Sequence, residues 1–169
     1  EKKIPSSILD SELLLSKTLN KTREEILTNL DQKIEKKNIL IFKKYLQRRS
    51  KNEPIAYIFQ EKEFWGNKFY VNKNTLIPRP ETEILVDKLL NIYKKKKISI
   101  LDIGTGSGCI IISLLINLSN SNGLGIDISK KAIQLAKKNK IKHKLLNRLK
   151  LSTQSLDKIY GKKFDLIVS

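Results

Sequence analysis

Apolar residues in the first part of the chain recur every three or four positions, which predicts helices. This pattern over residues 8–15 predicts the first helix. Residues 22–25 have the spacing of a capping box and predict a second helix that continues through Leu30. A third apolar stripe covers residues 39–46. Together these elements predict a small helical domain over residues 1–52, packed as a bundle with a polar outer face that is free to dock a partner.

The next segment, residues 53–80, has strand character and is interpreted as a hairpin linker. Pro54 ends the helical region that precedes it. Two short apolar runs then flank Gly66 and Asn67, and a Gly-Asn pair between such runs predicts a β-hairpin. Trp65, the single tryptophan, is expected to be a core or interdomain anchor rather than a residue that stacks on a substrate.

A stiff loop follows the predicted hairpin. Arg79 lies between Pro78 and Pro80, and the two proline rings restrict the backbone on either side of it. Pro80 also suits the first turn of a helix that continues to Tyr93. Arg79 is therefore either a solvated loop residue or a preorganised arginine beside a ligand site, and the residues alone leave both interpretations open.

From residue 98 onward, short apolar runs alternate with helical patterns, which predicts a parallel sheet crossed by helices. Strands are expected at 98–103, 124–128, 149–151 and 164–168, and helices at 109–118 and, after the N-cap Ser129, at 130–140. The predicted fold class is α/β, a Rossmann-like doubly wound sheet with right-handed crossovers. This domain is assigned residues 81–169, after the helical bundle and the hairpin linker.

Composition adds few constraints to this picture. No apolar run reaches the roughly 18–20 residues that span a membrane, and no signal peptide is visible. Cys109 is the only cysteine, so no internal disulfide can form. A cytoplasmic monomer without a metal centre is expected. The sequence has no methionine and ends at Ser169, directly after a predicted buried strand, so we expect a fragment trimmed at both ends with an incomplete sheet.

The net charge of +17 raises the question of nucleic-acid binding. Few of the 34 basic residues are arginines, and the lysines are scattered among abundant asparagine and isoleucine. This distribution favours a codon-composition bias spread over a solvated surface. A basic surface still favours weak, salt-sensitive contact with RNA or a ribosome-associated partner.

The candidate chemistry lies where the first strand of the predicted sheet meets its helix. Gly104, Gly106 and Gly108 occupy alternate positions there, so the backbone can bend sharply and approach a ligand. A dinucleotide-binding loop has the spacing G-x-G-x-x-G, whereas this one is G-x-G-x-G and is preceded by Asp102. That form suits a ligand with an amino-acid tail, because backbone amides can meet its carboxylate and Asp102 can attract its ammonium group, directly or through water.

A second acid, Asp127, ends the second predicted strand. Open parallel sheets bind ligands at the carboxyl ends of their strands, and a carboxylate there can accept hydrogen bonds from both hydroxyls of a ribose. We therefore expect a ligand that carries an amino acid and a sugar. Thr105 and Ser107 are counted with the three glycines as candidate binding residues.

Two resemblances narrow the interpretation. The residues similar to the cofactor site of class I S-adenosylmethionine-dependent methyltransferases are Asp102, Gly104, Thr105, Gly106, Ser107, Gly108 and Asp127. The segments similar to the PrmC/HemK family, the release factor glutamine N5-methyltransferases, are 10–15 in the helical domain and 53–58, 63–66 and 76–83 in the linker. The Pro-Arg-Pro-Glu-Thr-Glu stretch from Pro78 to Glu83 is a quite specific point of resemblance to this family.

This resemblance implies methyl transfer from S-adenosylmethionine to the side-chain amide nitrogen of the glutamine in the GGQ motif of peptide chain release factors. The Asn-Pro-Pro-Tyr signature of the family follows the fourth strand and would come directly after Ser169. The asparagine side chain and a proline carbonyl of that signature hold the target amide. No catalytic residue is therefore expected within the sequence, and the 169-residue chain alone is expected to methylate nothing detectably.

The sequence departs from the family after the third strand, where an aspartate and an apolar or aromatic residue usually contact the adenine. The aligned positions are Gln154 and Ser155, which implies either weaker cofactor binding or a shifted alignment of this stretch. The implied reaction needs neither a metal nor an acid–base pair. His143 is accordingly expected to be a solvated helix-end residue, and Cys109 a core residue.

Two other functions stay open. One is a nucleic-acid methyltransferase of the adenine N6 type, because such enzymes share an Asn-Pro-Pro-aromatic tetrapeptide and the chain is basic. The other is an inactive, truncated remnant that binds a cofactor or a partner without turnover.

Overall fold

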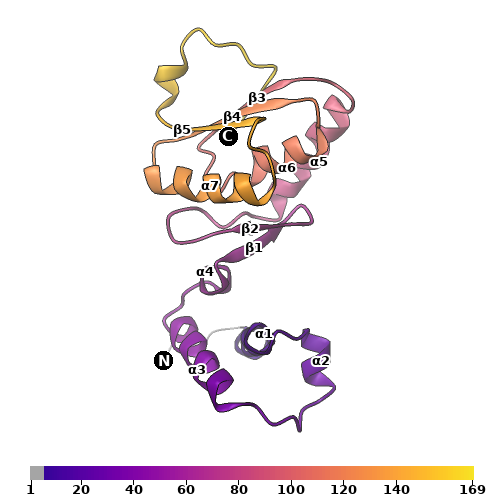
Figure 1. Cartoon of the computed structure of the whole chain (residues 1–169), viewed down its shortest axis with the longest axis vertical. Coiled ribbons are helices and arrows are strands. Elements are labelled where there is room, and N and C mark those ends of the chain that lie inside the picture. The colour runs from indigo at the N-terminus through magenta and orange to yellow at the C-terminus, as the bar shows by residue number, and fades with distance from the viewer. Residues whose placement is uncertain (1–5) are drawn as a thin grey trace. The chain divides into compact units, whose positions relative to one another are not determined.

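A computed structural model describes residues 6–169, which divide into two compact units between Phe59 and Gln60 (Figure 1). The first unit is helical. Its elements are α1 (Ser7–Leu19), α2 (Arg23–Leu27), α3 (Lys36–Ser50) and α4 (Ile55–Phe59). The second unit carries a two-stranded hairpin and a four-stranded sheet with its helices, and each unit is described by itself below.

The helical unit forms α1 and α2 where the sequence predicts them, but α2 is shorter than predicted. Leu14 of α1 is fully buried. The predicted capping box forms, because the Glu25 amide donates to Thr22 Oγ1 across 3.2 Å and Glu25 Oε2 accepts from the Thr22 amide at 2.6 Å. The prediction that α2 continues through Leu30 is wrong, since the helix ends at Leu27. There the Thr28 hydroxyl bonds back to the Glu24 carbonyl, a local bond that competes with further helix.

The short helix α4 was not predicted. Pro54 ends the preceding helical region, but it also begins the next turn, because its carbonyl accepts from the amides of Tyr57 (2.9 Å) and Ile58 (3.1 Å). A proline at the start of a helix loses nothing by lacking an N–H group. The assignment of a strand-like connector directly after Pro54 is therefore wrong for residues 55–59.

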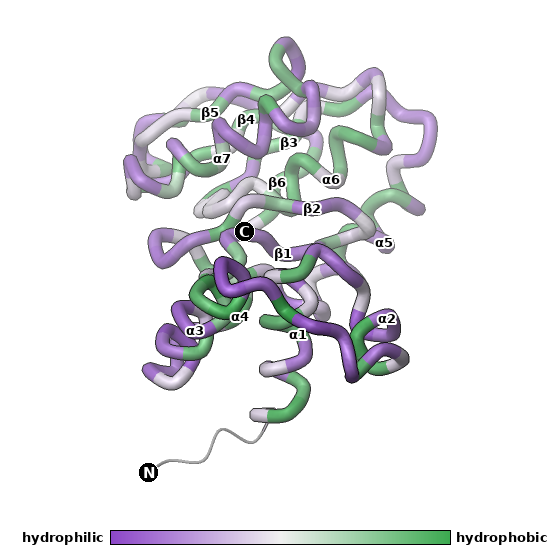
Figure 2. The backbone as a smooth tube through the Cα atoms, turned by 60° about the horizontal axis from the view of Figure 1, so that its bottom comes forward, coloured by the Kyte–Doolittle hydropathy of each residue, from purple (hydrophilic) through white to green (hydrophobic). Residues whose placement is uncertain are grey.

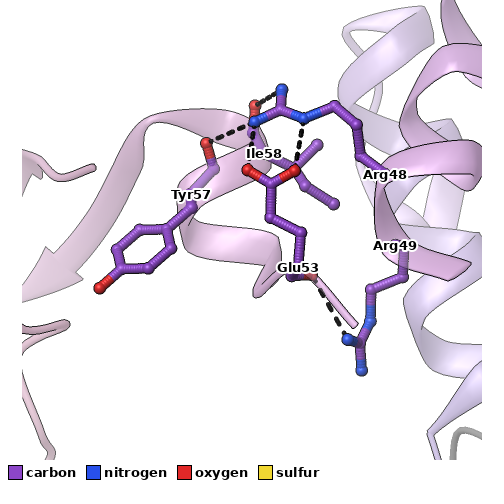
Figure 3. A network of polar contacts seen from close by, with 5 residues as sticks. All are labelled: Arg48, Arg49, Glu53, Tyr57 and Ile58. Atoms are coloured by element: carbon purple, nitrogen blue, oxygen red, sulfur yellow. Dashed lines mark hydrogen bonds and ion pairs between the residues drawn. The ribbon is translucent and has the colours of Figure 1, made fainter. Parts of the chain in front are cut away.

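Arg48 at the end of α3 ties this turn in place (Figure 3). Its guanidinium forms a two-point ion pair with the Glu53 carboxylate, at 2.5 and 2.8 Å. The same group donates to the carbonyls of Tyr57 and Ile58, at 3.2 and 3.3 Å, where α4 leaves carbonyls without helical partners. The neighbouring Arg49 bonds to the Glu53 carbonyl and pairs with Asp10 of α1 at 2.7 Å. Two adjacent arginines thus join three helices.

The second unit is an α/β structure, as predicted. Its elements are β1 (Glu61–Phe64), β2 (Asn67–Tyr70), α5 (Glu81–Tyr93), β3 (Ser99–Ile103), α6 (Cys109–Asn117), β4 (Asn122–Asp127), α7 (Lys130–Lys142), β5 (Leu149–Thr153), the 3-10 helix η1 (Leu156–Ile159) and β6 (Leu166–Val168). The four sheet strands are parallel in the order β5-β4-β3-β6. Ser129 caps α7 as expected, accepting from the Ala132 amide at 3.2 Å.

Successive residues of β3 are buried on opposite faces of the sheet. Ile100 is fully buried in the main core with α5, α6 and the hairpin, whereas Leu101 packs in a smaller cluster with Ile126 and Ile159. Helix α6 is apolar along almost its whole length, as its colour in Figure 2 shows. Figure 1 shows the hairpin beneath α7, on the side of that helix away from the sheet.

The hairpin forms one position earlier than predicted. Its two turn residues are Trp65 and Gly66, both with positive φ (51° and 63°), while Asn67 already pairs with Phe64. Two consecutive positive φ angles are typical of the tight turn that matches the twist of a hairpin. The Asn67 side chain supports the turn by donating to the Trp65 carbonyl at 2.8 Å. Trp65 itself packs against the main core, in agreement with its expected role as an anchor.

Candidate functional site

The structure brings the two predicted acids and the glycine turn together at the carboxyl edge of the sheet. The turn follows β3 directly, and Asp127 ends the adjacent strand β4, whose Ile126 is in register with Ile103. The Thr105 amide also donates to the Ile126 carbonyl at 2.9 Å, which ties the turn to β4. The parallel order of β3 and β4 thus places residues from distant parts of the sequence around one corner.

The three glycines have the backbone angles that the turn demands. Gly104, Gly106 and Gly108 have φ values of 71°, 56° and 81°, a region that residues with a Cβ adopt at a cost. A Cβ on Gly104 would meet nothing within 4 Å, and one on Gly106 only the Gly104 carbonyl oxygen at 3.8 Å. Gly108 differs, since a Cβ there would lie 3.0 Å from Ile112. The first two glycines therefore leave room for a ligand, while the third permits close packing of α6.

Asp127 is half-buried and holds the turn through both of its oxygens. Oδ2 accepts from the Gly106 amide at 3.0 Å, and Oδ1 accepts from the Ser129 amide at 2.8 Å. A carboxylate oxygen has two acceptor positions. Each oxygen thus keeps one position for a further donor, such as a ligand hydroxyl.

Asp102 lies behind the turn rather than in front of it. Its side chain is almost completely buried, and its Oδ2 accepts from the Thr105 hydroxyl at 2.6 Å. Burial raises the pKa of this carboxyl to about 7, against the lowering effect of the Thr105 hydrogen bond. A nearby cation would favour the ionised form. The electrostatic attraction predicted for this residue therefore depends on its protonation near neutral pH.

The hydroxyls of Thr105 and Ser107 do not face a ligand. Both side chains are buried, that of Thr105 against Asp102. These two predicted site residues can offer a ligand their backbone groups, while the Thr105 side chain supports the turn through Asp102.

Sequence reasoning missed one residue that contacts this turn, Asn139 of α7. It is fully buried, and its Nδ2 donates to the Ser107 carbonyl at 2.8 Å. The pattern contained a signal, because Asn139 follows Leu135 and Ala136 by four and three residues and so lies on the buried face of the helix. A polar side chain at such a position needs hydrogen-bond partners.

The positions aligned with the adenine contacts lie at the same edge of the sheet. The backbone amide of Gln154, immediately after β5, donates to the Asp127 backbone carbonyl at 3.1 Å. Ser155 precedes η1, and its hydroxyl donates to Asp157 at 3.3 Å. Arg79 is exposed on the loop before α5, and within residues 6–169 no hydrogen bond or ion pair links its side chain to the turn.

The remaining single residues have structural surroundings. Cys109 is buried in the main core, as expected. His143 follows α7, as predicted, and it is partly rather than fully exposed to solvent. Its ring packs against Phe69 in a tilted arrangement with centroids 4.7 Å apart, and Nε2 lies 3.2 Å from the Lys68 carbonyl oxygen. Partial burial lowers its pKa. No group of three potential metal ligands occurs in the part of the chain that the structure describes.

Basic residues are less scattered than their overall abundance indicates. Between Asp127 and Asp157 the sequence contains no acid, and its cations lie mainly on α7 and just after it, at Lys130, Lys131, Lys137, Lys138, Lys140, Lys142, Lys144, Arg148 and Lys150. A surface pocket of about 670 Å³ lies beside this helix, lined by Tyr70, Lys138 and Lys142 among others. The Lys142 ammonium sits 4.5 Å above the Tyr70 ring. The exposed side of α7 is therefore a cationic surface outside the glycine turn.

Comparison with known proteins connects this site to a family. Residues 1–59 match the PrmC N-terminal domain, and residues 94–169 match a methyltransferase domain. A release factor glutamine methyltransferase of Buchnera aphidicola is 40% identical over 95% of the chain. The chain is a homologue of the release factor glutamine methyltransferases. A bifunctional methyltransferase of Rickettsia typhi is 41% identical to the chain, also over 95% of its residues.

The chain spans 58% of the length of the Buchnera protein and 35% of the length of the Rickettsia protein. Among solved structures, a putative transferase from Pyrococcus horikoshii matches 60% of this chain over 38% of its own chain, with a TM-score of 0.52 and 14% identity. That likeness shows the Rossmann-like fold of the second unit.

The methyltransferase domain implies S-adenosylmethionine as its cofactor. The turn fits such a ligand, because no protein atom lies close to the positions that Cβ atoms on Gly104 and Gly106 would occupy. A ligand can therefore approach the backbone there. Asp127, at the end of β4, bonds to the Gly106 amide, and Asp102 is buried against Thr105 of the same turn. In the described part of the chain, no helix is both long enough and apolar enough to cross a membrane.

Proposed function

We propose that the protein methylates the side-chain amide nitrogen of the glutamine in the GGQ motif of peptide chain release factors, with S-adenosylmethionine as methyl donor. The observation that carries this proposal is the open glycine turn between Asp102 and Asp127. It occurs in a chain of which 95% aligns with a release factor glutamine methyltransferase at 40% identity.

The proposed roles follow from the chemistry of the cofactor. The backbone of residues 104–108 receives the carboxylate of the methionine part, and ionised Asp102 attracts its ammonium group. Asp127 accepts from the ribose hydroxyls with the acceptor positions that Gly106 and Ser129 leave free. Gln154 and Ser155, at the end of the neighbouring strand, are assigned to the adenine. Arg79 is assigned to the loop beside the site.

The reaction asks mainly for alignment. An amide nitrogen is a poor nucleophile, while the bound cofactor supplies a methyl group on a sulfonium, which is a good leaving group. The protein therefore contributes by holding the two reactants in line and by excluding water. In this step the sulfur keeps the electron pair of its bond to the methyl group and the amide nitrogen gives up one proton, and we assign neither a metal nor a general base to it.

The helical unit is assigned to recognition of the release factor. Apart from the buried Leu14 and Asp10, its side chains are at least partly exposed through most of α1 to α3. Few buried contacts occupy this surface, so it is available to a protein substrate. Residues 1–52 are proposed as the recognition domain, residues 53–80 as its linker, and residues 81–169 as the cofactor domain.

A second candidate is a nucleic-acid methyltransferase of the adenine N6 type. The cationic side of α7 favours it, because clustered lysines attract a phosphate backbone. The same surface also permits weak RNA contact by an enzyme whose substrate is a release factor, so binding of RNA does not decide between the two.

The deciding experiment is methyl transfer from labelled S-adenosylmethionine by the protein encoded by the whole reading frame that contains this sequence. The acceptors are a release factor, the same factor with its GGQ glutamine replaced by asparagine, and RNA and DNA. We expect label only in the first. Label only in nucleic acid would establish the second candidate, and cofactor binding without any transfer would indicate an inactive remnant. An Asp127→Ala variant serves as the control for cofactor dependence.

A further inference from the structure

Asn139 uses its acceptor oxygen and both of its N–H donors in hydrogen bonds inside the protein. Oδ1 accepts from the Tyr70 amide at 2.7 Å, and Nδ2 donates to the Tyr70 carbonyl at 3.0 Å and to the Ser107 carbonyl at 2.8 Å. A carboxamide has two N–H donors, and both are used here. Because the residue is fully buried, no water replaces these partners.

The two bonds to Tyr70 have the form of a strand pairing. One side-chain amide exchanges both an N–H and a C=O interaction with one backbone residue of β2, as a neighbouring strand would. The third bond goes to Ser107, in the middle of the glycine turn. A single side chain on α7 therefore bonds to the edge of the hairpin and to the cofactor turn at once.

Both segments have other supports. Phe64 and Phe69 bury the hairpin in the main core, and Glu61 pairs with Lys142 at 3.3 Å. The turn is held by the bond between Gly106 and Asp127 and by that between Thr105 and Asp102. Loss of Asn139 thus removes the polar connection between the segments while each keeps its own packing.

The position of the hairpin in the chain gives this connection a consequence. The hairpin begins directly after the boundary between the two units, so it is the segment through which the helical unit is covalently attached. Tyr70, the last residue of this hairpin, bonds to Asn139, and Asn139 bonds to the Ser107 carbonyl.

We propose that Asn139 is a positioning residue that couples the hairpin to the cofactor turn, so that the seating of the hairpin and the affinity for S-adenosylmethionine depend on each other. This inference rests on the proposed function for the identity of the ligand. Coupling of two sites is reciprocal. A ligand on the turn must therefore steady the hairpin as much as the hairpin steadies the turn.

The test uses Asn139→Ala and Asn139→Asp, with S-adenosylhomocysteine as the probe. Alanine leaves the Tyr70 and Ser107 carbonyls without donors, and aspartate turns an acceptor towards both. Asn117→Ala is the matched control, because that exposed asparagine makes its one bond within its own helix, to the Ser113 carbonyl. Val86→Ala, in the main core on α5, supplies a variant destabilised away from the turn.

Two readouts are measured at a temperature where circular dichroism shows every variant folded. Calorimetry gives the dissociation constant, and we expect both Asn139 variants to bind about tenfold more weakly, since the cost of an unpaired buried group corresponds to about 5- to 150-fold. Hydrogen exchange followed by mass spectrometry covers the hairpin at 60–71 and the turn at 103–110. Ligand should slow exchange in both segments of the wild type and of the two controls, but only in the turn of the Asn139 variants.

The coupling is overturned if ligand still protects the hairpin of the Asn139 variants, or if Val86→Ala weakens binding equally at equal loss of stability. If the wild type binds no cofactor, the proposed function fails, and the exchange of the ligand-free proteins then decides the coupling. Asn139→Ala should speed exchange in the hairpin and in the turn together, beyond the change in Val86→Ala. Faster exchange in the hairpin alone would contradict it.

Discussion

The amide of Gly106 donates a hydrogen bond across 3.0 Å to Oδ2 of Asp127, the last residue of the neighbouring strand. The acid that we assign to the ribose thus shapes the turn to which we assign the methionine part. The other oxygen of Asp127 accepts from the amide of Ser129, the N-cap residue of α7. One carboxylate therefore organises the turn, the strand end and the helix start.

Asp127→Asn tests this relationship. An asparagine offers one acceptor oxygen, and its NH₂ group would face the amide of either Gly106 or Ser129. We expect the affinity for S-adenosylhomocysteine to fall by at least about tenfold, since both a ligand contact and the shape of the turn are lost. Calorimetry measures the change. Asp87→Asn, at an exposed acid of α5, should bind as the wild type does, and equal binding by the Asp127 variant would rule out the assigned role.

Asp102→Asn should stabilise the ligand-free protein at alkaline pH. Burial raises the pKa of Asp102 from 3.8 to about 7, so the stability that its protonated form provides is present below pH 4 and is lost as pH rises through 7. An asparagine does not ionise. We expect its advantage in free energy of unfolding to grow by up to about 4 kcal/mol between pH 4 and pH 8. Urea unfolding at several pH values measures this, and a difference independent of pH would contradict it.

The same substitution should weaken cofactor binding at pH 8, because the ammonium group loses its counter-charge. In the wild type, affinity should decline as pH falls below about 7 and Asp102 becomes protonated. The dissociation constant of Asp102→Asn should vary less over this range. A residue that stabilises the empty protein when neutral and the complex when charged marks a compromise between stability and binding.

Gly125→Ala should impair the site without touching the ligand. A Cβ at Gly125 would lie 2.9 Å from Thr105 Oγ1 and 2.8 Å from Leu151. Thr105 must then move, which disturbs its bond to Asp102. Gly123→Ala on the same strand is the matched comparison, because its Cβ would meet Ile111, 2.6 Å away, in the core instead. Both variants should lower the melting temperature, but only Gly125→Ala should also weaken cofactor binding, as thermal unfolding and calorimetry will show.

Arg48→Gln should loosen the end of the helical unit. The substitution removes the two-point pair with Glu53 and the bonds to the Tyr57 and Ile58 carbonyls. Several hydrogen bonds to a charged group are involved, so we expect a loss of about 1–3 kcal/mol in the unfolding of residues 6–59. Hydrogen exchange over α3 and α4 measures it. Lys37→Gln, which breaks the exposed pair with Glu35, should have almost no effect.

The glycine turn and its two acids were predictable from the sequence because their spacing follows directly from strand and helix periods. A short apolar run, an acid and alternate glycines leave few arrangements for Gly104 to Gly108. Asp127 could be assigned to the same edge because parallel strands end on the same side of a sheet.

The order of the strands and the partners of Asn139 could not be predicted in this way. Both depend on which segments meet in space, and the period of a helix reports only which face is buried. The hairpin shifted by one position for a related reason. A Trp-Gly turn needs a positive φ at Trp65, and this cost is offset by packing of the indole against the core, which no local pattern reveals.

The sulfur of Cys109 lies at the first residue after the glycine turn, at the start of α6. A helix N-terminus ordinarily favours a thiolate, yet burial prevails here and raises the pKa of this thiol to about 11. The thiol is therefore protonated at neutral pH. Were S-adenosylmethionine held on this turn as proposed, a thiolate at this position would compete with the substrate amide for the methyl group. Burial keeps the sulfur of Cys109 protonated and therefore a poor nucleophile.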